Sequence, residues 1–265
     1  MKKFLFYIVG FLILTSCGSY QKLLKSTNAE EKFAAAKDFF LEKKYVKSAT
    51  LLYDISQTYK NTRQGEEVWY LLAESYIGQK DYYSASEWYK SYVKSYPRGE
   101  YARECKYMIG YCYFLDSSDA RLDQHSTYEA IAALTEYTQI YPESESAAKA
   151  DSLITILQDK LAYKGFLNAR MYLNLGTYLG NNYHAAVIEA ENVLKEYPNT
   201  KHRESLSFLI LQAKYREAAL SAHEKKRERF SEVIDEYYKY STEFPTSKHS
   251  GEAARMVKEA KKNVK

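Results

Sequence analysis

Residues 85–97, Ala-Ser-Glu-Trp-Tyr-Lys-Ser-Tyr-Val-Lys-Ser-Tyr-Pro, contain the pattern that decides the fold of this chain. Apolar positions recur there with spacings of four, three and four residues, at Ala85, Tyr89, Tyr92 and Tyr96. This spacing places them on one face of an α-helix. The proline that closes the segment ends the helix, because it has no N–H to donate and its ring clashes with the preceding turn. The segment is therefore predicted to be a helix with an aromatic packing face.

The same unit recurs along the chain. An aromatic residue precedes each of the four prolines, Pro97, Pro142, Pro198 and Pro245, and an alanine or valine anchor lies twelve residues before each, at Ala85, Ala130, Ala186 and Val233. Ala49 stands twelve before Asn61 in a first unit that has lost its proline. The anchors are 36, 45, 56 and 47 residues apart, against about 34 in a regular tetratricopeptide array. An irregular array of elongated helix pairs is predicted.

The helix before the segment completes the pattern. Its residues Trp69, Leu72, Ala73 and Tyr76, together with the anchors above, match the tetratricopeptide consensus. We therefore expect an all-α, right-handed solenoid of about five tetratricopeptide-like helix pairs. An ordinary helical bundle with accidental Tyr-Pro pairs is the alternative, but four units share one anchor-to-proline distance. Two residues after the prolines stand expected N-caps for the next helices, namely Gly99, Ser144, Thr200 and Ser247.

The N-terminus contains a lipoprotein signal, Leu14-Thr15-Ser16-Cys17. Lys2 and Lys3 precede an apolar run, Phe4 to Leu14, that is too short to cross a hydrocarbon core of about 30 Å. We expect residues 1–16 to be a signal peptide, Cys17 to carry lipid, and residues 17–27 to be a linker. An ordinary cleaved signal with Cys17 incidental is the alternative.

The boundaries that follow place repeats 1–3 in residues 28–160 and repeats 4–5 in residues 161–265, where the first helices are degenerate. The residue after the lipidated cysteine is Gly18 rather than the Asp that retains some bacterial lipoproteins in the inner membrane. This favours the outer membrane, with the body of the protein on the periplasmic face.

Composition and motifs exclude several classes of function. The net charge of +4 falls to +2 once residues 1–16 are removed, and the charges are interspersed, so no nucleic acid partner is expected. The five histidines form no i, i+4 pair beside an acid, and no phosphate-binding glycine loop or Gly-x-Ser-x-Gly elbow occurs. We expect no enzyme activity, no cofactor and no metal. Cys105 and Cys112 lie about 10.5 Å apart along a helix, too far for a disulfide, and are expected to be buried thiols.

In such arrays the first helix of each pair lines a concave groove. The register places Tyr70, Glu74 and Ile77 of the second unit, and Tyr107, Tyr111 and Phe114 of the third, at groove positions, with Met171, Leu175 and Tyr178 as candidates in the fourth. Tyrosine offers apolar area and a hydroxyl at low entropy cost, which suits an extended peptide. It is equally a packing residue in this tyrosine-rich chain, and that alternative stays open.

The last two units are expected to dock a folded protein. The basic stretch around Arg227 and Arg229 and the tail Lys258 to Lys265 flank the final pair, whose apolar face needs a cover. The competing interpretation is that these repeats only cap the solenoid.

A lipoprotein signal followed by five irregular tetratricopeptide-like pairs resembles the BamD family of β-barrel assembly lipoproteins. The likeness covers nearly the whole mature chain, and its most specific elements are Cys17, the elongated repeats and the connection Ser95-Tyr96-Pro97-Arg98-Gly99-Glu100-Tyr101-Ala102. The resemblance implies binding of unfolded outer-membrane proteins by the N-terminal repeats. It also implies docking of the C-terminal repeats to a BamA-like barrel subunit that bears POTRA domains.

Two other kinds of lipoprotein remain open. A pilotin-like tetratricopeptide lipoprotein for secretin or pilus assembly would share anchor and fold, although its repeats are typically more regular. A glycan-capturing nutrient-uptake lipoprotein would use aromatic residues to stack on sugars, although such proteins are usually about twice as long.

Overall fold

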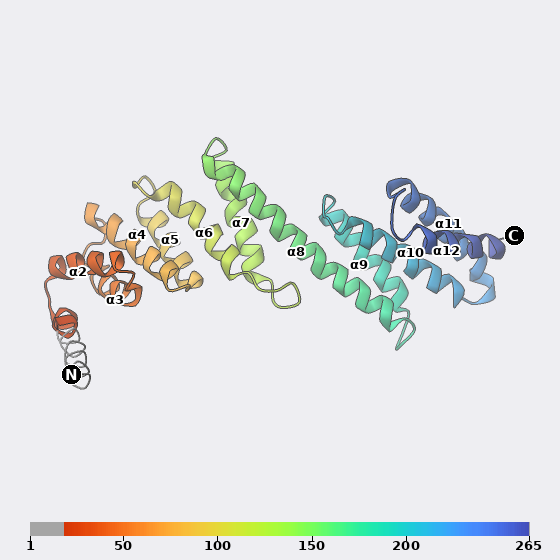
Figure 1. Cartoon of the computed structure of the whole chain (residues 1–265), viewed down its shortest axis with the longest axis horizontal. Coiled ribbons are helices and arrows are strands. Elements are labelled where there is room, and N and C mark those ends of the chain that lie inside the picture. Colours follow the sequence, from red (N-terminus) through yellow and green to blue (C-terminus); the bar gives the residue numbers. More distant parts are fainter. Residues whose placement is uncertain (1–18, 265) are drawn as a thin grey trace, which may run out of the picture. The chain divides into compact units, whose positions relative to one another are not determined.

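The computed structural model describes residues 19–264, and every regular element in that range is an α-helix (Figure 1). Residues 19–25 are helical. The helices that follow are α2 (Ala29–Leu41), α3 (Tyr45–Ile55), α4 (Arg63–Gly78), α5 (Tyr82–Ser95), α6 (Ala102–Asp116), α7 (His125–Ile140), α8 (Glu145–Leu175), α9 (Asn182–Glu196), α10 (Arg203–Ala219), α11 (His223–Glu243) and α12 (Ser250–Val264). The predicted all-α class is confirmed.

Consecutive helices form the predicted pairs. The pairs α2/α3, α4/α5, α6/α7, α8/α9 and α10/α11 are followed by α12, which the sequence prediction did not count as a separate element. Met256 and Ala260 of α12 join one hydrophobic core with Phe230 and Val233 of α11. The apolar face of the last pair is therefore covered by the chain itself, so the need for a cover is no argument for a partner there.

The described chain divides into two compact units. The first holds the described residues up to Ser117 together with His125–Leu153, and the second holds Ser118–Gln124 and the described residues from Ile154 onward. The division falls inside the long helix α8, the same helix that contains the boundary expected at residues 160 and 161.

The anchors of the repeat lie in the cores. Ala85, Ala130, Ala186 and Val233 have no exposed side-chain surface. Between α6 and α7 the helices approach closely at Gly110, where a Cβ atom would lie 2.6 Å from the Leu134 side chain. Glycine is needed there because a Cβ would clash. Tyr53, four residues after the anchor Ala49 and therefore predicted by the same spacing to lie on the apolar face, is exposed and forms a T-shaped ring pair with Trp88.

Asn61 explains why the first unit has no proline. Its φ of 64° is left-handed, a conformation that asparagine tolerates and proline cannot adopt. Its backbone N–H also donates to the Tyr96 hydroxyl at 2.9 Å. Proline would lack this donor. Asn61 therefore links the connection between α3 and α4 to the end of α5.

Thr200 and Ser247 do not cap the next helix as predicted, because the chain makes a further turn before that helix begins. The Thr200 hydroxyl donates to Asp159 at 2.7 Å, and the Ser247 hydroxyl donates to Glu204 at 2.6 Å. Glu66 of α4 fills the same role at the connection that contains Gly99, since it accepts the Glu100 N–H at 3.0 Å. At these three connections, a carboxylate from the first helix of the preceding pair therefore holds the chain. Only Ser144 stands directly before its helix.

Candidate peptide-binding groove and docking surface

Tyr70 is a half-buried residue of α4 that contacts the next repeat. Its ring is stacked on Tyr101, with 4.2 Å between centroids and 12° between planes. Its hydroxyl donates to Glu104 of α6 at 3.0 Å. Burial is the main reason that the pKa of Tyr70 is raised, and Glu74 and Glu104 raise it further. This predicted groove residue therefore also connects the second and third repeats.

Glu74 lies one turn further along α4 and is half-buried. Its carboxylate accepts a hydrogen bond from the hydroxyl of Tyr89, a fully buried residue of α5. Burial raises the pKa of Glu74, the bond from Tyr89 lowers it, and the charge of Glu104 raises it again. The structure thus brings Tyr70 and Glu74 around Glu104. Ile77, the third predicted residue of this helix, is half-buried on α4.

The two cysteine thiols of α6 are unreactive. Cys105 and Cys112 are buried and free, as predicted. Burial, strengthened by the charge of Glu74, raises the pKa of Cys112 to about 12. Burial, with Glu104 and Glu74, raises the pKa of Cys105 as well. Both side chains therefore stay protonated and behave as small apolar residues.

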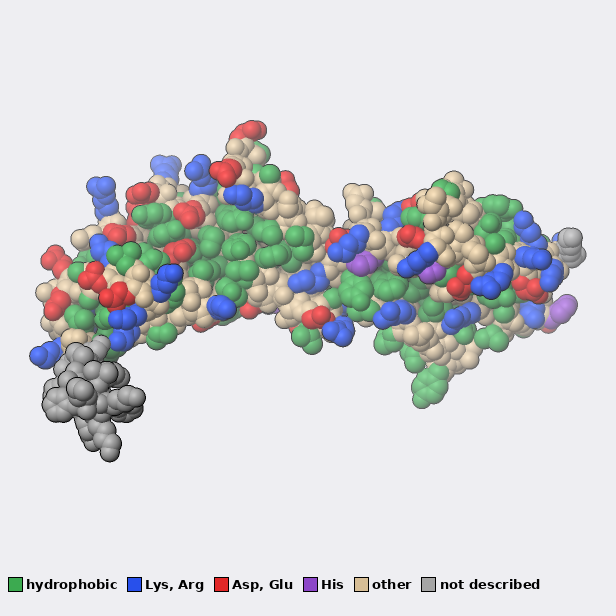
Figure 2. All heavy atoms as spheres, in the orientation of Figure 1, with side chains coloured by type: hydrophobic (Ala, Val, Ile, Leu, Met, Phe, Trp, Pro, Cys, Tyr) green, Lys and Arg blue, Asp and Glu red, His purple; other side chains and the backbone are tan. Residues whose placement is uncertain are grey.

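Three predicted groove residues form one row along α6, which we call the α6 aromatic row. Tyr107 and Tyr111 have centroids 5.9 Å apart, and Tyr111 and Phe114 have centroids 6.2 Å apart, each pair with 13° between planes. All three side chains are half-buried. The edge of Tyr107 also meets Tyr137 of α7 at 5.4 Å. Figure 2 shows hydrophobic side chains gathered over the part of the chain that contains α6 and α7.

The second unit contains the other predicted residues. Met171 and Leu175 are exposed on α8, and Tyr178 is exposed in the turn that follows. Arg227 is exposed on α11, where it lines a surface depression with acidic residues, among them Glu224, Glu228, Glu232 and Asp235. Arg229 is engaged within the unit, since its guanidinium pairs with Glu217 at 3.1 Å and donates to the Ser221 hydroxyl at 2.6 Å.

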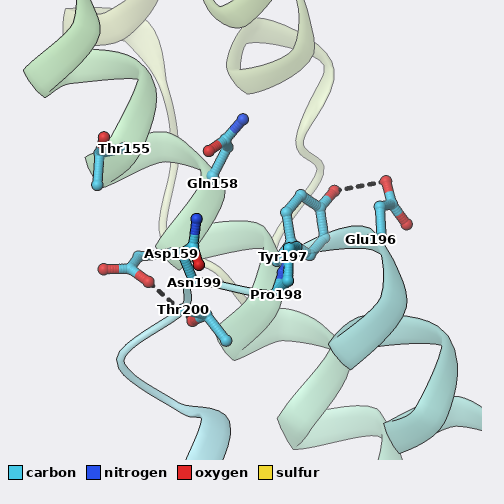
Figure 3. Close-up of a pocket in the computed structure, with 8 residues that line it drawn as sticks. All are labelled: Thr155, Gln158, Asp159, Glu196, Tyr197, Pro198, Asn199 and Thr200. Atoms are coloured by element: carbon cyan, nitrogen blue, oxygen red, sulfur yellow. Dashed lines mark hydrogen bonds between the residues drawn. The ribbon is translucent and has the colours of Figure 1, made fainter.

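A polar depression of about 310 Å³ lies in the second unit between α8 and the connection from α9 to α10 (Figure 3). In that view the hydroxyl of Tyr197 points to Glu196, to which it donates at 2.7 Å. Asp159 accepts the Thr200 hydroxyl there, as described above, and the Lys201 N–H at 3.1 Å. The carboxylates that line this depression thus serve the connection between helices.

The predicted lipidation site, Cys17, lies outside the residues that the structure describes. Among residues 19–264, no helix is long and apolar enough to cross a membrane. The same part of the chain contains no group of three or more His, Cys, Asp and Glu side chains placed to hold a metal ion.

Sequence reasoning missed Tyr101 and Glu104 as members of this region. Tyr101 was considered only as part of the connection from Ser95 to Ala102, and Glu104 was not considered. The available signal is spacing, because Glu104 stands 34 residues after Tyr70, close to one tetratricopeptide period.

Comparison with known proteins places this architecture in a family. The family model described as YfiO, outer membrane lipoprotein, matches residues 25–231, more than three quarters of the chain. The chain belongs to this family. Expectation and comparison agree here, since curated relatives of the chain carry the name BamD.

An outer membrane protein assembly factor BamD from Caulobacter vibrioides is 31% identical over 122 residues, which are 46% of this chain and 38% of that protein. The assembly factors BamD of Neisseria meningitidis serogroup A and of Neisseria gonorrhoeae are each 26% identical over 231 residues, 80% of this chain and 84% of each relative. The chain thus spans well under half of the Caulobacter relative and most of the Neisseria relatives.

Proposed function

We propose that this chain is a non-enzymatic assembly factor for outer-membrane β-barrel proteins, anchored by lipid on Cys17 at the periplasmic face of the outer membrane. Its membership of the YfiO family of outer membrane lipoproteins is the observation that carries the proposal. The names of its relatives support the assembly role. The irregular helix pairs also favour it over a pilotin-like lipoprotein with regular repeats.

The first unit binds an extended segment of an unfolded barrel protein. The α6 aromatic row supports this assignment, because three rings held nearly parallel on one helix provide apolar area with their rotamers already restricted. A peptide with aromatic side chains at its end offers rings that fit against such a row. Glu74, half-buried on α4, adds an acceptor for backbone N–H groups of the bound segment.

The second unit docks to a BamA-like barrel subunit through its POTRA domains. Arg227 is an exposed cation of α11 that stands among acidic side chains, and the C-terminal helix carries the lysines Lys258, Lys261 and Lys262. Exposed charges that complement those of a partner speed association with it.

Affinity purification of the lipidated chain from its own membranes tests the proposal. We expect a barrel protein with POTRA domains to co-purify, and we expect depletion of the chain to lower the amount of folded barrel proteins in the outer membrane. Recovery of a secretin in its place, with barrel proteins unaffected by depletion, would contradict the assembly role and favour a pilotin.

A further inference from the structure

The described chain begins with a segment that is fixed on the first helix pair. The ring of Tyr20 meets Phe39 of α2 edge to face, with 5.6 Å between centroids. The ammonium group of Lys47, at the start of α3, lies 5.0 Å from the centre of the Tyr20 ring and 5.3 Å from that of Phe39. Two aromatic rings and one cation therefore hold residue 20 against α2 and α3.

The turn between α2 and α3 beside this contact exposes large apolar side chains. Leu41 is 78% exposed and Val46 is 65% exposed. Lysines surround them at Lys43, Lys44 and Lys47, and the acids of the same stretch are Asp38 and Glu42. Glu42 pairs with Lys44 at 2.6 Å. Two aliphatic side chains set among lysines are the combination that favours the interface of a bilayer, where apolar groups enter and cations stay with the headgroups.

The short chain between Cys17 and Tyr20 indicates which partner the turn between α2 and α3 contacts. Only Gly18 and Ser19 separate Cys17 from Tyr20, so these Cα atoms are at most about 11 Å apart. We propose that the α2–α3 turn surface, formed by Leu41, Lys43, Lys44 and Val46, rests on the bilayer that holds the lipid of Cys17. Leu41 and Val46 enter the interfacial layer, and the lysines contact anionic headgroups. This inference rests on the lipid anchor of the proposed function.

A short, docked tether does more than retain the protein at the membrane. A long flexible linker would let the first unit turn freely, whereas the Tyr20 contact keeps one face of it near the headgroups at a high effective concentration. Weak contacts by two aliphatic side chains then suffice to set its orientation. The expected consequence is one preferred face of the first unit toward the bilayer.

Depth-dependent fluorescence quenching tests this orientation on the full, lipidated chain. A single dye is attached at Val46→Cys, which is selective because Cys105 and Cys112 are buried. The protein is reconstituted in vesicles of phosphatidylethanolamine and phosphatidylglycerol that contain lipids with a quencher on the acyl chain. The matched control is Gln57→Cys, an exposed position in the turn after α3, beyond the end of a helix that rises about 13.5 Å from Val46 to Ile55.

We expect quenching at Val46→Cys to be at least about threefold stronger than at Gln57→Cys, because interfacial burial reaches only about 5–10 Å. Tyr20→Ala should reduce the signal at position 46 to that of the control, while Lys22→Ala, a change at an exposed neighbour, should leave it unaltered. Tyr20→Ala acts on the tether and leaves the dye and its own surroundings intact, so it separates membrane contact from a general affinity of the dye for lipid.

The outcomes are distinct. Protein that floats with the vesicles but shows equal quenching at both positions overturns the membrane contact and leaves the lipid anchor standing. Quenching at position 46 that survives Tyr20→Ala overturns the tether. Protein that fails to float at all, with no lipid found on Cys17 by mass spectrometry, overturns the anchor and this inference with it.

Discussion

The ring of Tyr70 lies flat on the ring of Tyr101, with 4.2 Å between centroids, and its hydroxyl donates to Glu104 at 3.0 Å. A residue predicted to face a ligand thus joins two repeats of the first unit. Replacement of Tyr70 affects folding as well as binding, so a test of the groove is better placed on the α6 aromatic row.

Tyr70→Phe and Tyr70→Ala separate the two contacts of this side chain. The phenylalanine variant keeps the stacked ring and loses the hydrogen bond, so the free energy of unfolding should fall by about 1 kcal/mol. The alanine variant loses the ring also and should cost about 3 kcal/mol or more. Urea unfolding followed by circular dichroism measures both, and equal losses for the two variants would contradict the stacking account.

Glu74→Gln should stabilise the protein at neutral pH. Burial raises the pKa of the Glu74 carboxyl in the folded chain, so the native state binds this proton more tightly than the unfolded state. Its contribution to stability is complete below the unfolded pKa and is lost as pH rises through the folded pKa. Glutamine resembles the protonated form and still accepts the Tyr89 hydroxyl.

Thermal unfolding of the two proteins as a function of pH measures this effect. The midpoint of Glu74→Gln should exceed that of the wild type at pH 7, and the difference should vanish below the ordinary carboxyl pKa of 4.5. A variant that is less stable than the wild type at pH 7 would show that the charge of Glu74 stabilises the fold.

Local spacing was enough to predict the helix pairs. Ala85, Ala130 and Ala186 are fully buried because positions twelve residues before an aromatic-proline pair fall on one helix face. The α6 aromatic row follows from the same logic, since i, i+4 and i+7 share a face. Such features depend only on neighbours within one helix.

Features that depend on a partner in another helix were not predictable. Ser247 was expected to cap a helix, but Glu204, 43 residues earlier, accepts its hydroxyl. Arg229 was expected to face a partner protein, but it pairs with Glu217 of the preceding helix. Helix α12 was overlooked because its few apolar residues, among them Ala253, Met256 and Val257, lie within a strongly charged stretch.

The lipid on Cys17 has a direct test. Cys17→Ser removes the thiol that receives the diacylglyceryl group, so an unprocessed precursor or a soluble protein should accumulate. Membrane fractionation and the mass of the N-terminal peptide measure this. Normal processing and normal membrane association of the serine variant would show that Cys17 is incidental.

Charge reversal should change the free energy of unfolding more at Arg229 than at Arg227. Arg229→Glu places a carboxylate against Glu217 and should lower the free energy of unfolding by about 1–3 kcal/mol. Arg227→Glu, at an exposed site, should change it by less than about 0.5 kcal/mol.

The rate at which Arg227→Glu associates with the isolated POTRA domains, measured at low and high salt, then reports on docking alone. We expect slower association at low salt and a smaller difference at high salt. An unchanged rate at low salt would remove Arg227 from the docking surface.

Binding of a barrel-protein C-terminal peptide to the α6 aromatic row is the measurement that tests the proposed function most directly. The double variant Tyr111→Ala and Phe114→Ala removes two rings of the row and leaves Tyr107 packed on Tyr137. The matched control is Tyr128→Ala, an aromatic side chain of α7 that is 56% exposed.

Calorimetric titration should show affinity reduced at least about tenfold by the double variant. The control should stay within about twofold of the wild type, since surface changes of this kind have small effects. Affinity of the double variant within twofold of the wild type, with its helical circular dichroism intact, would contradict the groove.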